Sequence, residues 1–567
     1  MKTNDNCWFQ FCFLITLVTI CVLSFTSKAQ SNRQWSTYYG GSSYEYAYGV
    51  ATDDAGNVYI TGETQSNYGI TTGAYGAYQS AFGGAADAFL VKFNAAGVRI
   101  WATYYGGAQI DRANSIAIDP DGNIYLAGST NSSSGIASPG VMGAGGAFQP
   151  SLSGSTDAFL LKLDAAGNRL WSTYYGGNGD DVANSVSCDA AGNVCIGGIT
   201  QSFSGIASNG AYQTAHGLAG LDAFLVKFDK DGNRLWGTYF GGPGHDWGYG
   251  VSNDALGNIY LTGVTASITG IAFNGSQMTS GGGGADAFLV KFDASGARQW
   301  ATYYGGSGYD FGNNKVATDA QNNVYLFGGT SSANGIAFNG FQMTFGGVTD
   351  GFLAKFNASG TRLWATYFGG PATEEAFSIA ISNFGGIFIN GDTYSSTGIA
   401  SGGFQNSLIG SENQFIANFN SDGNRICSTY YGSVHEEDGS IATDNTGHVF
   451  LLANTYSNGG LASGGFQNSF AGARDAFLVK FSTCTNACCS AYGSSNVCDN
   501  DDITSVTFAN VTTTTPSFYN PGQTCLPGYT NLSDNPVYSP DVYTFVPGCT
   551  YAFTAGIGLT AGSTYQV

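Results

Sequence analysis

One segment, Trp-x-Thr-Tyr-(Tyr or Phe)-Gly-Gly, recurs along this chain at an almost constant interval. Six copies begin at Trp35, Trp101, Trp171, Trp236, Trp300 and Trp364. A seventh copy begins at Cys427, where Cys replaces the Trp. Successive copies start 63 to 70 residues apart, so the chain repeats one structural unit seven times. A fixed period of this length determines the architecture, and most recurring residues are expected to recur because the fold needs them.

The composition favours short strands and argues against one class of partner. Of 567 residues, 85 are Gly and only 11 are Pro, and no stretch shows sustained helical periodicity. Many Tyr and Phe residues with few charges fit β-strands joined by glycine turns. The net charge is -20 and the 19 Lys and Arg residues form no basic run, which argues against nucleic acid as a partner. An acidic surface also fits an extracellular protein.

The first complete unit predicts four strands. They are expected at Ala47–Thr52, Val58–Gly62, Asp87–Phe93 and Val98–Tyr105. The turn between the first two contains Asp and Asn, which bond their own backbone in turns, and Gly, which accepts a positive φ. The third strand recurs in later units, starting at Asp157, Asp222, Asp286, Asp350, Asn413 and Asp475. Four short strands, mostly apolar on both faces, predict a sheet with a packed neighbour on each side.

The two ends of the repeat region complement each other. The region begins with a fourth-strand segment, Arg33–Tyr39, that no third strand precedes. It ends on a third strand, Asp475–Phe481, that no fourth strand follows. Pairing these segments would close a ring without exposed sheet edges, so we predict an all-β fold, a seven-bladed β-propeller closed by its N-terminal strand. An open β-solenoid is the alternative, but its coils have a shorter period and need no complementary ends.

These motifs together resemble a known family, the bacterial SBBP β-propeller repeat. The resemblance covers about Arg33 to Phe481 through W-x-T-Y-Y-G-G, D-x-x-G-N-x-Y and D-A-F-L-x-K-F. It implies a secreted or surface protein, with no general catalytic activity established for the repeat. The sequence departs from the family pattern at Cys427, at Asn413 and Asn418 in the sixth unit's third strand, and at Gly385–Gly386 in a turn.

When the seven repeats are aligned with one another, one position, or column, carries a carboxylate in every repeat. It follows the Gly-Gly pair and precedes the first strand. Its seven predicted members are Glu45, Asp111, Asp181, Asp246, Asp310, Glu374 and Glu437. Propeller geometry would arrange them in a ring at one face, where they would raise one another's pKa or bind a cation such as Ca²⁺. Alternatively, each carboxylate caps backbone amides of its own loop or meets an arginine. We favour caps, because a repeat copies structural caps as faithfully as ligands, and we predict no metal site and no cofactor.

Most cations also occupy fixed positions in the repeat. The arginines two residues before the Trp position are Arg33, Arg99, Arg169, Arg234, Arg298, Arg362 and Arg425. The lysines near the ends of the third strands are Lys92, Lys162, Lys227, Lys291, Lys355 and Lys480. We interpret both columns as structural, through pairing at blade edges and snorkelling, and the Trp side chains as apolar anchors against neighbouring blades.

The long loop between the second and third strands is the expected interaction surface. Every unit carries a glutamine there: Gln79, Gln149, Gln213, Gln277, Gln342, Gln405 and Gln467. An aromatic residue precedes six of them, as at Tyr78, Phe148 and Tyr212. An aromatic face beside an amide suits sugar binding, so a glycan-binding propeller lectin is one hypothesis. The alternative, which we favour, is that these aromatics pack the loops onto the blades.

No catalytic constellation occurs in the sequence. The four histidines, His216, His245, His435 and His448, lie in different columns, and nucleophile-elbow, zinc-protease and phosphate-loop motifs are absent. Asp119–Asn123 and Asp229–Asn233 resemble the start of an EF-hand loop but lack its closing Glu, so turns are expected. We predict that the protein is not an enzyme and has no catalytic residues. A propeller enzyme acting on polysaccharide or peptide is the rival, since such sites combine residues far apart in sequence.

Residues 1–29 have the pattern of a secretion signal. Lys2 precedes an apolar stretch from Trp8 to Phe25, and Ser27–Ala29 supplies small residues, so cleavage is expected after Ala29. A retained membrane anchor is the alternative, because the apolar stretch is long for a signal. A lipid anchor on Cys21 is rejected, because a bulky Ile precedes it. No other segment is long and apolar enough to predict a membrane span.

The composition changes after Phe481. Lys and Arg disappear and six cysteines follow: Cys484, Cys488, Cys489, Cys498, Cys525 and Cys549. An even count in a secreted chain indicates disulfides, and Cys188 with Cys195 is a further candidate pair. Residues 482–502 are expected to form a cysteine-rich linker. Residues 503–567 are expected to form a β-rich segment that loosely resembles the first half of a GEVED-type β-sandwich. Because the sequence stops within an expected strand, a longer protein with a C-terminal sorting or anchor domain is also expected.

The signal, the ring and the missing catalytic set combine into one functional hypothesis. Residues 30–481 are predicted to form an exported, non-catalytic propeller for surface display, adhesion or ligand binding, secreted or at the cell surface. Protein or carbohydrate ligands are expected at the loop face, with no nucleic acid partner and no membrane span in the mature chain.

Overall fold

The computed structural model describes residues 33–71, 78–139, 146–217 and 220–482, and the short antiparallel strands β29 (Val506–Thr507) and β30 (Val542–Tyr543). The chain divides into two compact units, one of which is Gln30–Cys484. Every regular element in the described ranges is a strand, and none of those ranges contains a helix that could cross a membrane. The expected secretion signal, the six C-terminal cysteines and nearly all of the GEVED-like segment lie outside the described residues.

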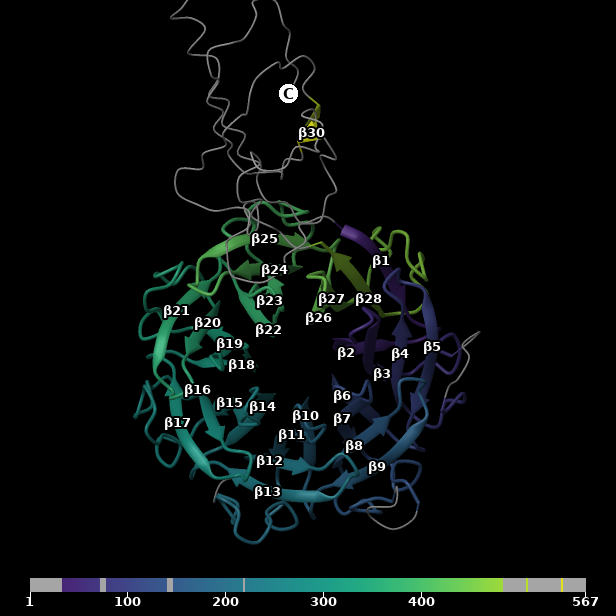
Figure 1. Ribbon diagram of the computed structural model, residues 1–567. Helices are drawn as coiled ribbons and strands as arrows, with labels where there is room; N and C mark the ends of the chain where they lie inside the picture. Colours follow the sequence, from purple (N-terminus) through teal and green to yellow (C-terminus); the bar gives the residue numbers. More distant parts are fainter. Residues whose placement is uncertain are drawn as a thin grey trace, which may run out of the picture. The chain divides into compact units, whose positions relative to one another are not determined.

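The unit Gln30–Cys484 contains seven four-stranded antiparallel sheets, the blades of a propeller (Figure 1). The innermost strands are β2 (Glu45–Thr52), β6 (Asp111–Ile118), β10 (Asp181–Cys188), β14 (Asp246–Asn253), β18 (Asp310–Thr318), β22 (Glu374–Ile381) and β26 (Glu436–Thr443). The second strands are β3 (Val58–Thr64), β7 (Ile124–Thr130), β11 (Val194–Thr200), β15 (Ile259–Thr265), β19 (Val324–Thr330), β23 (Ile387–Thr393) and β27 (Val449–Thr455).

The third strands are β4 (Asp87–Phe93), β8 (Asp157–Leu163), β12 (Asp222–Phe228), β16 (Asp286–Phe292), β20 (Asp350–Phe356), β24 (Asn413–Phe419) and β28 (Asp475–Phe481). The outermost strands are β5 (Arg99–Tyr105), β9 (Arg169–Tyr175), β13 (Arg234–Phe240), β17 (Arg298–Tyr304), β21 (Arg362–Phe368), β25 (Arg425–Tyr431) and β1 (Arg33–Tyr39). We number the blades 1 to 7 in the order of their innermost strands.

The N-terminal strand closes the ring, as predicted. Strand β1 pairs antiparallel with β28, from Arg33 opposite Phe481 to Tyr39 opposite Ala476, and so completes blade 7. The first and second strands are longer than predicted from the sequence. In blade 1, the first strand begins at Glu45 and the second ends at Thr64, because these two residues pair at the end of the ladder.

The hairpin turns between first and second strands follow the predicted chemistry. Asp53 Oδ1 accepts hydrogen bonds from the backbone amides of Ala55 and Asn57, and Gly56 has a φ of 75°. The EF-hand-like segment at Asp229 is also a turn, in which Oδ1 accepts from the amide of Asn233 at 2.9 Å. Such turns bind their own backbone and leave no open cation loop.

The apolar core of the propeller is divided among the blade junctions. One buried cluster combines Trp35 and Tyr39 of blade 7 with Val58, Ile60 and Phe89 of blade 1. Six comparable clusters are distributed around the ring among the described residues. Strands that are apolar on both faces therefore pack against a neighbour on each side.

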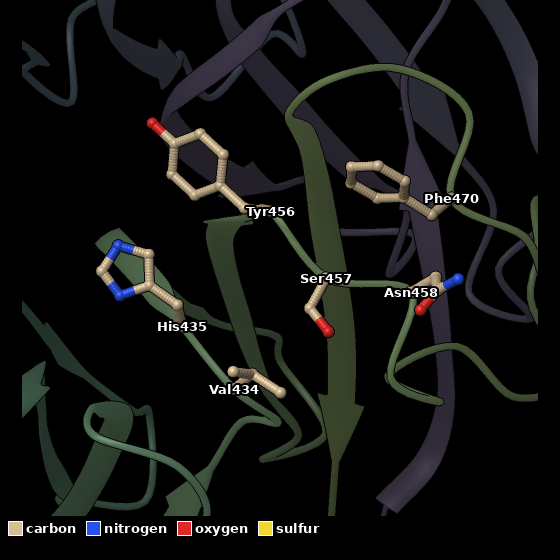
Figure 2. A pocket seen from close by; sticks show the side chains of 6 residues that line it. All are labelled: Val434, His435, Tyr456, Ser457, Asn458 and Phe470. Atoms are coloured by element: carbon tan, nitrogen blue, oxygen red, sulfur yellow. The ribbon is translucent and has the colours of Figure 1, made fainter.

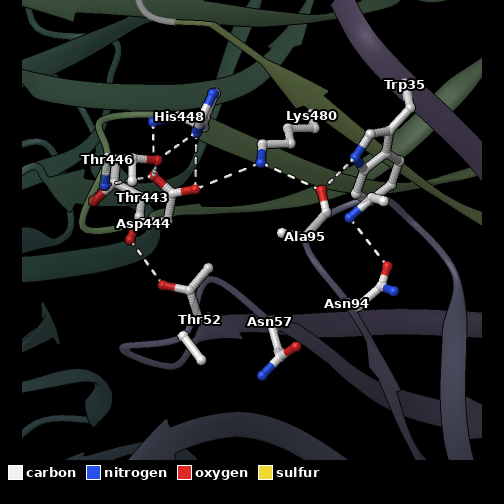
Figure 3. Close-up of polar contacts among 12 residues, drawn as sticks. Trp35, Thr52, Asn57, Asn94, Ala95, Thr443, Asp444, Thr446, His448 and Lys480 are labelled. Carbon is white, nitrogen blue, oxygen red and sulfur yellow. Dashed lines mark hydrogen bonds and ion pairs between the residues drawn. The ribbon is translucent and has the colours of Figure 1, made fainter.

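Polar contacts bind the outer part of one blade to a turn of the next (Figure 3). Trp35 Nε1 donates to the carbonyl oxygen of Ala95 at 3.0 Å, and Lys480 Nζ donates to the same oxygen at 3.3 Å. Lys480 also pairs with Asp444 at 3.7 Å. Gly97 has a φ of 78°, and a Cβ there would lie 2.8 Å from the Trp35 ring, so the turn requires glycine.

The lysine column is structural but it does not snorkel. Lys162, Lys227 and Lys291 are 5%, 3% and 7% exposed. Lys162 Nζ donates to the carbonyl of Lys230 at 3.0 Å in the next blade's turn. Because the ammonium groups find carbonyl and carboxylate partners within the junctions, they need not reach solvent.

Cys188 and Cys195 are free thiols, so the pairing considered from the sequence is wrong. Cys188 lies opposite Val194 in the ladder, next to Cys195. Successive residues of a strand point to opposite faces, so the two thiols enter different blade junctions. Cys195 belongs to the cluster between blades 3 and 4, whereas Cys188 packs against the cluster between blades 2 and 3.

The Trp anchors are expected to contribute strongly to stability. Trp236→Ala removes a ring that is 9% exposed, together with the hydrogen bond from Nε1 to the Ala294 carbonyl at 3.1 Å. Its expected cost is about 3–5 kcal/mol in the free energy of unfolding, measured by chemical denaturation. Trp247→Ala is the control, because Trp247 is only half-buried on an innermost strand. Equal losses for the two variants would show that docking onto the neighbouring turn contributes nothing.

Candidate functional site

The predicted acidic column caps its own loops. Glu45 Oε2 accepts from the amide of Gly41 at 2.8 Å, and Oε1 accepts from the Thr64 hydroxyl at 2.7 Å. The equivalent glycine amides donate hydrogen bonds to the carboxylates of Asp111, Asp181, Asp246, Asp310 and Glu374. No group of three or more potential metal ligands occurs within the described ranges. The interpretation as backbone caps is confirmed for these six positions.

The seventh member of this column is Glu436, and the prediction of Glu437 is wrong. Glu436 lies opposite Thr455, as Glu45 lies opposite Thr64. The Ser433 hydroxyl donates to Glu436 Oε1 at 2.8 Å. The loop that leads from Tyr431 to the innermost strand of blade 7 is one residue shorter than the equivalent loops of the other blades. A count at constant spacing therefore reaches Glu437, one residue beyond the true position.

A second carboxylate meets the first at six of the seven junctions between blades, as at Gly106. A Cβ on Gly106 would lie 2.7 Å from both Asp111 Oδ2 and Asp87 Oδ1, so both carboxylates contact this glycine. Asp87 is fully buried, and its Oδ1 has no hydrogen-bond partner among the described residues. Burial and the neighbouring Asp111 carboxylate raise the pKa of Asp87 to about 6. The pair is therefore built to hold a proton at mildly acidic pH.

The same arrangement recurs around the ring with one exception. Burial and the partner carboxylate raise the pKa to about 6 at Asp181, Asp246, Asp310, Asp350 and Asp475. Between blades 6 and 7, Asn413 replaces the third-strand aspartate, and its Nδ2 donates to Glu436 Oε2 at 3.1 Å. This amide supplies a hydrogen between the two groups at any pH, whereas a pair of carboxylates has one only when one of the two is protonated.

The glutamine and aromatic columns of the long loops are also occupied by structural contacts. Gln79 Nε2 donates to Asp87 Oδ2 at 3.1 Å, and its Oε1 accepts from the Gly106 amide at 3.1 Å. The ring of Tyr78 lies 4.7 Å from the guanidinium of Arg169 in the next blade. The equivalent contacts are Arg234–Phe148, Arg298–Tyr212, Arg425–Phe341, Arg33–Phe404 and Arg99–Phe466. The aromatics therefore pack loops onto blades, as favoured from the sequence.

Because the repeat copies structural residues, positions where one sector departs from it are informative. Immediately before the third strand, blades 1 to 5 carry Ala86, Thr156, Leu221, Ala285 and Thr349, whereas blades 6 and 7 carry Glu412 and Arg474. Immediately after the second strand, they carry Gln65, Asn131, Gln201, Ala266 and Ser331, whereas blades 6 and 7 carry Tyr394 and Tyr456. At these two positions, charged and aromatic side chains thus replace small, polar or aliphatic ones in this sector alone.

Three of these departures, Glu412, Tyr456 and Arg474, meet His435 and Asp438 in one group, which we call the blade 6–7 cluster. His435 Nδ1 lies 3.0 Å from Glu412 Oε2, and its ring stacks on Tyr456 with centroids 5.6 Å apart. Arg474 Nη1 donates to the Tyr456 hydroxyl at 3.0 Å, and Nη2 pairs with Asp438 Oδ2 at 2.9 Å. One connected network therefore carries acid, imidazole, hydroxyl and guanidinium groups.

Buried polar residues next to the cluster contact its side chains. Asp392 is 2% exposed and accepts a hydrogen bond from Gln414 Nε2. Burial and the nearby Glu412 carboxylate raise the pKa of Asp392 well above its usual value. Arg474 is 4% exposed, and its guanidinium lies 4.3 Å from the ring of Tyr46 in blade 1. The cluster therefore contacts residues of three blades, 6, 7 and 1.

A cavity of about 350 Å³ adjoins this cluster (Figure 2). Its lining residues are Val434, His435, Tyr456, Ser457, Asn458 and Phe470. In Figure 2 the rings of His435 and Tyr456 lie on one side and that of Phe470 on the other. Tyr456 is 42% exposed, so a ligand can reach its ring. An aromatic wall beside a few polar groups is the usual form of a small-ligand site.

The four histidines do not come together. His448 lies in the blade 7 turn against Asp444 at 3.0 Å, His245 stacks on Trp247, and His216 contacts the Gly217 carbonyl. His435 alone of the four belongs to the cluster. Sequence analysis missed Glu412, Tyr456 and Arg474, although aligning the seven repeats with one another and reading their differences would have found them.

Comparison with known proteins agrees with the architecture. A profile of the SBBP β-propeller repeat matches residues 34–69, 100–135 and 235–268. The chain is 26% identical over 205 residues to an uncharacterized WD repeat-containing protein, L264, of Acanthamoeba polyphaga mimivirus. It is 25% identical over 326 residues to the regulatory protein FlaEY of Caulobacter vibrioides. These matches cover 31% and 53% of this chain but span only 14% and 32% of the two relatives.

Two solved structures are similar at low identity. One is a protein of unknown function from Dyadobacter fermentans, with a TM-score of 0.36 and 10% identity, covering 79% of this chain and 98% of that one. The other is an ulvan lyase of polysaccharide lyase family PL25, with a TM-score of 0.38 and 11% identity, covering 74% and 92%. Superpositions at these scores carry no argument about function.

The carboxylate pairs predict an unusual dependence of stability on pH. A carboxyl group whose pKa is raised by folding adds stability below its unfolded pKa of about 4, and this stability is lost as pH rises through about 6. The ring should therefore be more resistant to urea at pH 5 than at pH 8. Asn413→Asp adds a seventh pair and should cost about 1–3 kcal/mol at pH 8 but little at pH 5.

Asn420→Asp is the matched control. Asn420 occupies the turn position that Asp164 holds in blade 2. There, despite partial burial, hydrogen bonds from the turn lower the pKa of the Asp164 carboxyl group. The effect of Asn420→Asp should be small and equal at both pH values. Chelation by EDTA should leave the melting temperature unchanged. A fall on adding EDTA that calcium restores and that Asp181→Asn weakens would instead assign these carboxylates to a cation.

Proposed function

We propose that this chain, which carries SBBP β-propeller repeats in a closed ring of seven blades, is an exported, non-catalytic scaffold that binds a ligand at the blade 6–7 cluster. Adhesion or display at the cell surface is the role that this proposal assigns to it. The observation that carries it is the departure of blades 6 and 7 from an otherwise regular repeat, beside a cavity of about 350 Å³.

Two properties support a scaffold. The recurring Trp, Arg, Lys, Gln and acidic side chains hold blades and loops together, so they leave the repeat itself without a reactive group. A ring whose blades pack on both sides also presents its loops on a rigid base, which suits recognition at low entropic cost. Export is supported by the apolar stretch from Trp8 to Phe25 and by the net charge of -20.

A neutral sugar is the ligand class that the cluster fits best. The rings of Tyr456 and Phe470 offer apolar faces for a pyranose. The amide of Asn458 and the hydroxyl of Ser457, which also line the cavity, donate and accept hydrogen bonds, which matches sugar hydroxyl groups that do both. We therefore propose the cavity as the carbohydrate site in preference to the aromatic–glutamine loops, where arginines pack on rings such as Tyr78 and Phe148.

A polysaccharide- or peptide-cleaving enzyme is the second candidate. It is favoured by the contact of His435 with Glu412 at 3.0 Å, beside the buried Arg474, because acid–base chemistry uses such groups. Incubation with polysaccharides and peptides distinguishes the two candidates. Turnover that Glu412→Gln abolishes would make the protein an enzyme, whereas an absence of product supports the scaffold.

The binding prediction can be tested with the full chain on a glycan array, followed by titration calorimetry of any hit. His435→Ala and Tyr456→Ala should each weaken binding at least about tenfold, or about 1.4 kcal/mol, because each removes a wall of the cavity. His245→Ala is the matched control: it occupies the same column in blade 4 and should bind normally. An empty array, or binding that both cluster variants retain, would remove glycan recognition at this site.

A further inference from the structure

One lysine lies outside the lysine column of the repeat, on the innermost strand of blade 5. Lys315 pairs with Phe327 in the ladder between β18 and β19, three residues before β18 ends. At the same ladder position the other blades carry Gly49, Ser115, Ser185, Gly250, Ser378 and Ser440. A long amine side chain therefore occurs where the repeat otherwise has glycine or serine.

The amine of Lys315 has a carbonyl oxygen and not a carboxylate as its partner. Its Nζ donates to the Tyr249 carbonyl of blade 4 at 3.1 Å. The lysines of the column differ, because each of those six pairs with an aspartate at 2.9–3.9 Å. Within the described ranges, no carboxylate forms an ion pair with Lys315. A positive charge on this amine is therefore not compensated by a nearby negative one.

The hydrogen bond to Tyr249 does not by itself require a lysine. At the two preceding junctions, neutral amides tie one innermost strand to the next. Asn114 Nδ2 donates to the Ala183 carbonyl at 2.9 Å. Asn184 Nδ2 donates to the Gly248 carbonyl at 2.8 Å. Because a neutral donor makes such a contact without placing a charge between blades, the amine of blade 5 adds a property that the contact does not need.

The surroundings of Lys315 favour the neutral form of its amine, because burial without a counter-ion disfavours the charged form. Desolvation accordingly lowers the pKa of Lys315 to about 8. A neutral lysine amine is a nucleophile, and desolvated lysines form Schiff bases with carbonyl compounds. Lys315 and Tyr249 are both partly exposed on the innermost strands β18 and β14 (Figure 1), so a small molecule can reach the amine.

We propose that Lys315 is a covalent binding site for small aldehydes, which it holds as an imine, independently of the ligand proposed for the blade 6–7 cluster. In this step the lone pair of Nζ attacks the carbonyl carbon of the aldehyde and a C–N bond forms. The carbonyl oxygen takes up the two protons of the neutral amine and leaves as water, so a C=N double bond remains. The step consumes no oxidant and no reductant.

Reductive labelling of the full chain tests the proposal directly. The chain is incubated at about pH 7 with propionaldehyde and sodium cyanoborohydride, which reduces the imine to a stable secondary amine, and is then digested and analysed by mass spectrometry. Lys315 should be labelled at least about tenfold faster than Lys230, an exposed lysine in a turn, because a lowered pKa leaves more of an amine neutral at this pH. Labelling of Lys315 that is no faster than that of Lys230 overturns the proposal.

A variant separates the nucleophile from the hydrogen bond. Lys315→Gln keeps a neutral donor for the Tyr249 carbonyl, so it should retain the native melting temperature and lose the fast phase of labelling. A fast phase that persists in this variant would belong to another lysine and would contradict the proposal. In the native chain, the rate at which trinitrobenzenesulfonate modifies Lys315 should reach half of its maximum near pH 8, since this reagent reacts with neutral amines. A half-maximum above about pH 10, where an ordinary lysine titrates, also contradicts it.

Discussion

The pairing of β1 with β28 is the interaction on which the rest of this structure depends. Each blade buries its two faces against its neighbours, so a ring that stays open would expose apolar sheet faces and an unpaired strand edge at once. Residues from the two ends of the repeat region meet in this sheet, and they can do so only when all other blades are in place. Closure therefore makes the stability of each junction depend on the others.

The junctions combine apolar packing with buried polar groups. A Trp and a Lys reach the same carbonyl oxygen of the next blade, as Trp35 and Lys480 do at Ala95. Deeper in the junction, two carboxylates share a narrow space and burial raises the pKa of Asp87. Asn413 shows that the fold accepts an amide in that space, so the requirement is for a hydrogen between the two groups and not for a second charge.

Regularity of this kind explains where a function can reside. The residues that recur in every blade are occupied in holding the ring together, and changing one of them weakens a junction. Blades 6 and 7 differ at Glu412, Tyr456 and Arg474, which the other blades do without; Tyr456 lines the cavity, and Glu412 and Arg474 contact the two cluster residues that line it. The strand pair that closes the ring, β1 with β28, lies in the same sector, and Cys427 occupies the Trp position of blade 6.

The sequence by itself determined the seven units and the four strands of each. It also determined the turn chemistry at residues such as Asp53 and the closure by Arg33–Tyr39. All of these follow from local pattern and a fixed period. Only the tertiary structure decided that Glu436 and not Glu437 completes the acidic column, since ladder register and not residue counting sets position. It also decided that Cys188 and Cys195 face different junctions, and that Glu412, His435 and Arg474 share one network. These residues lie on different blades or loops, and their proximity depends on how the sheets close around the ring, which no local pattern encodes.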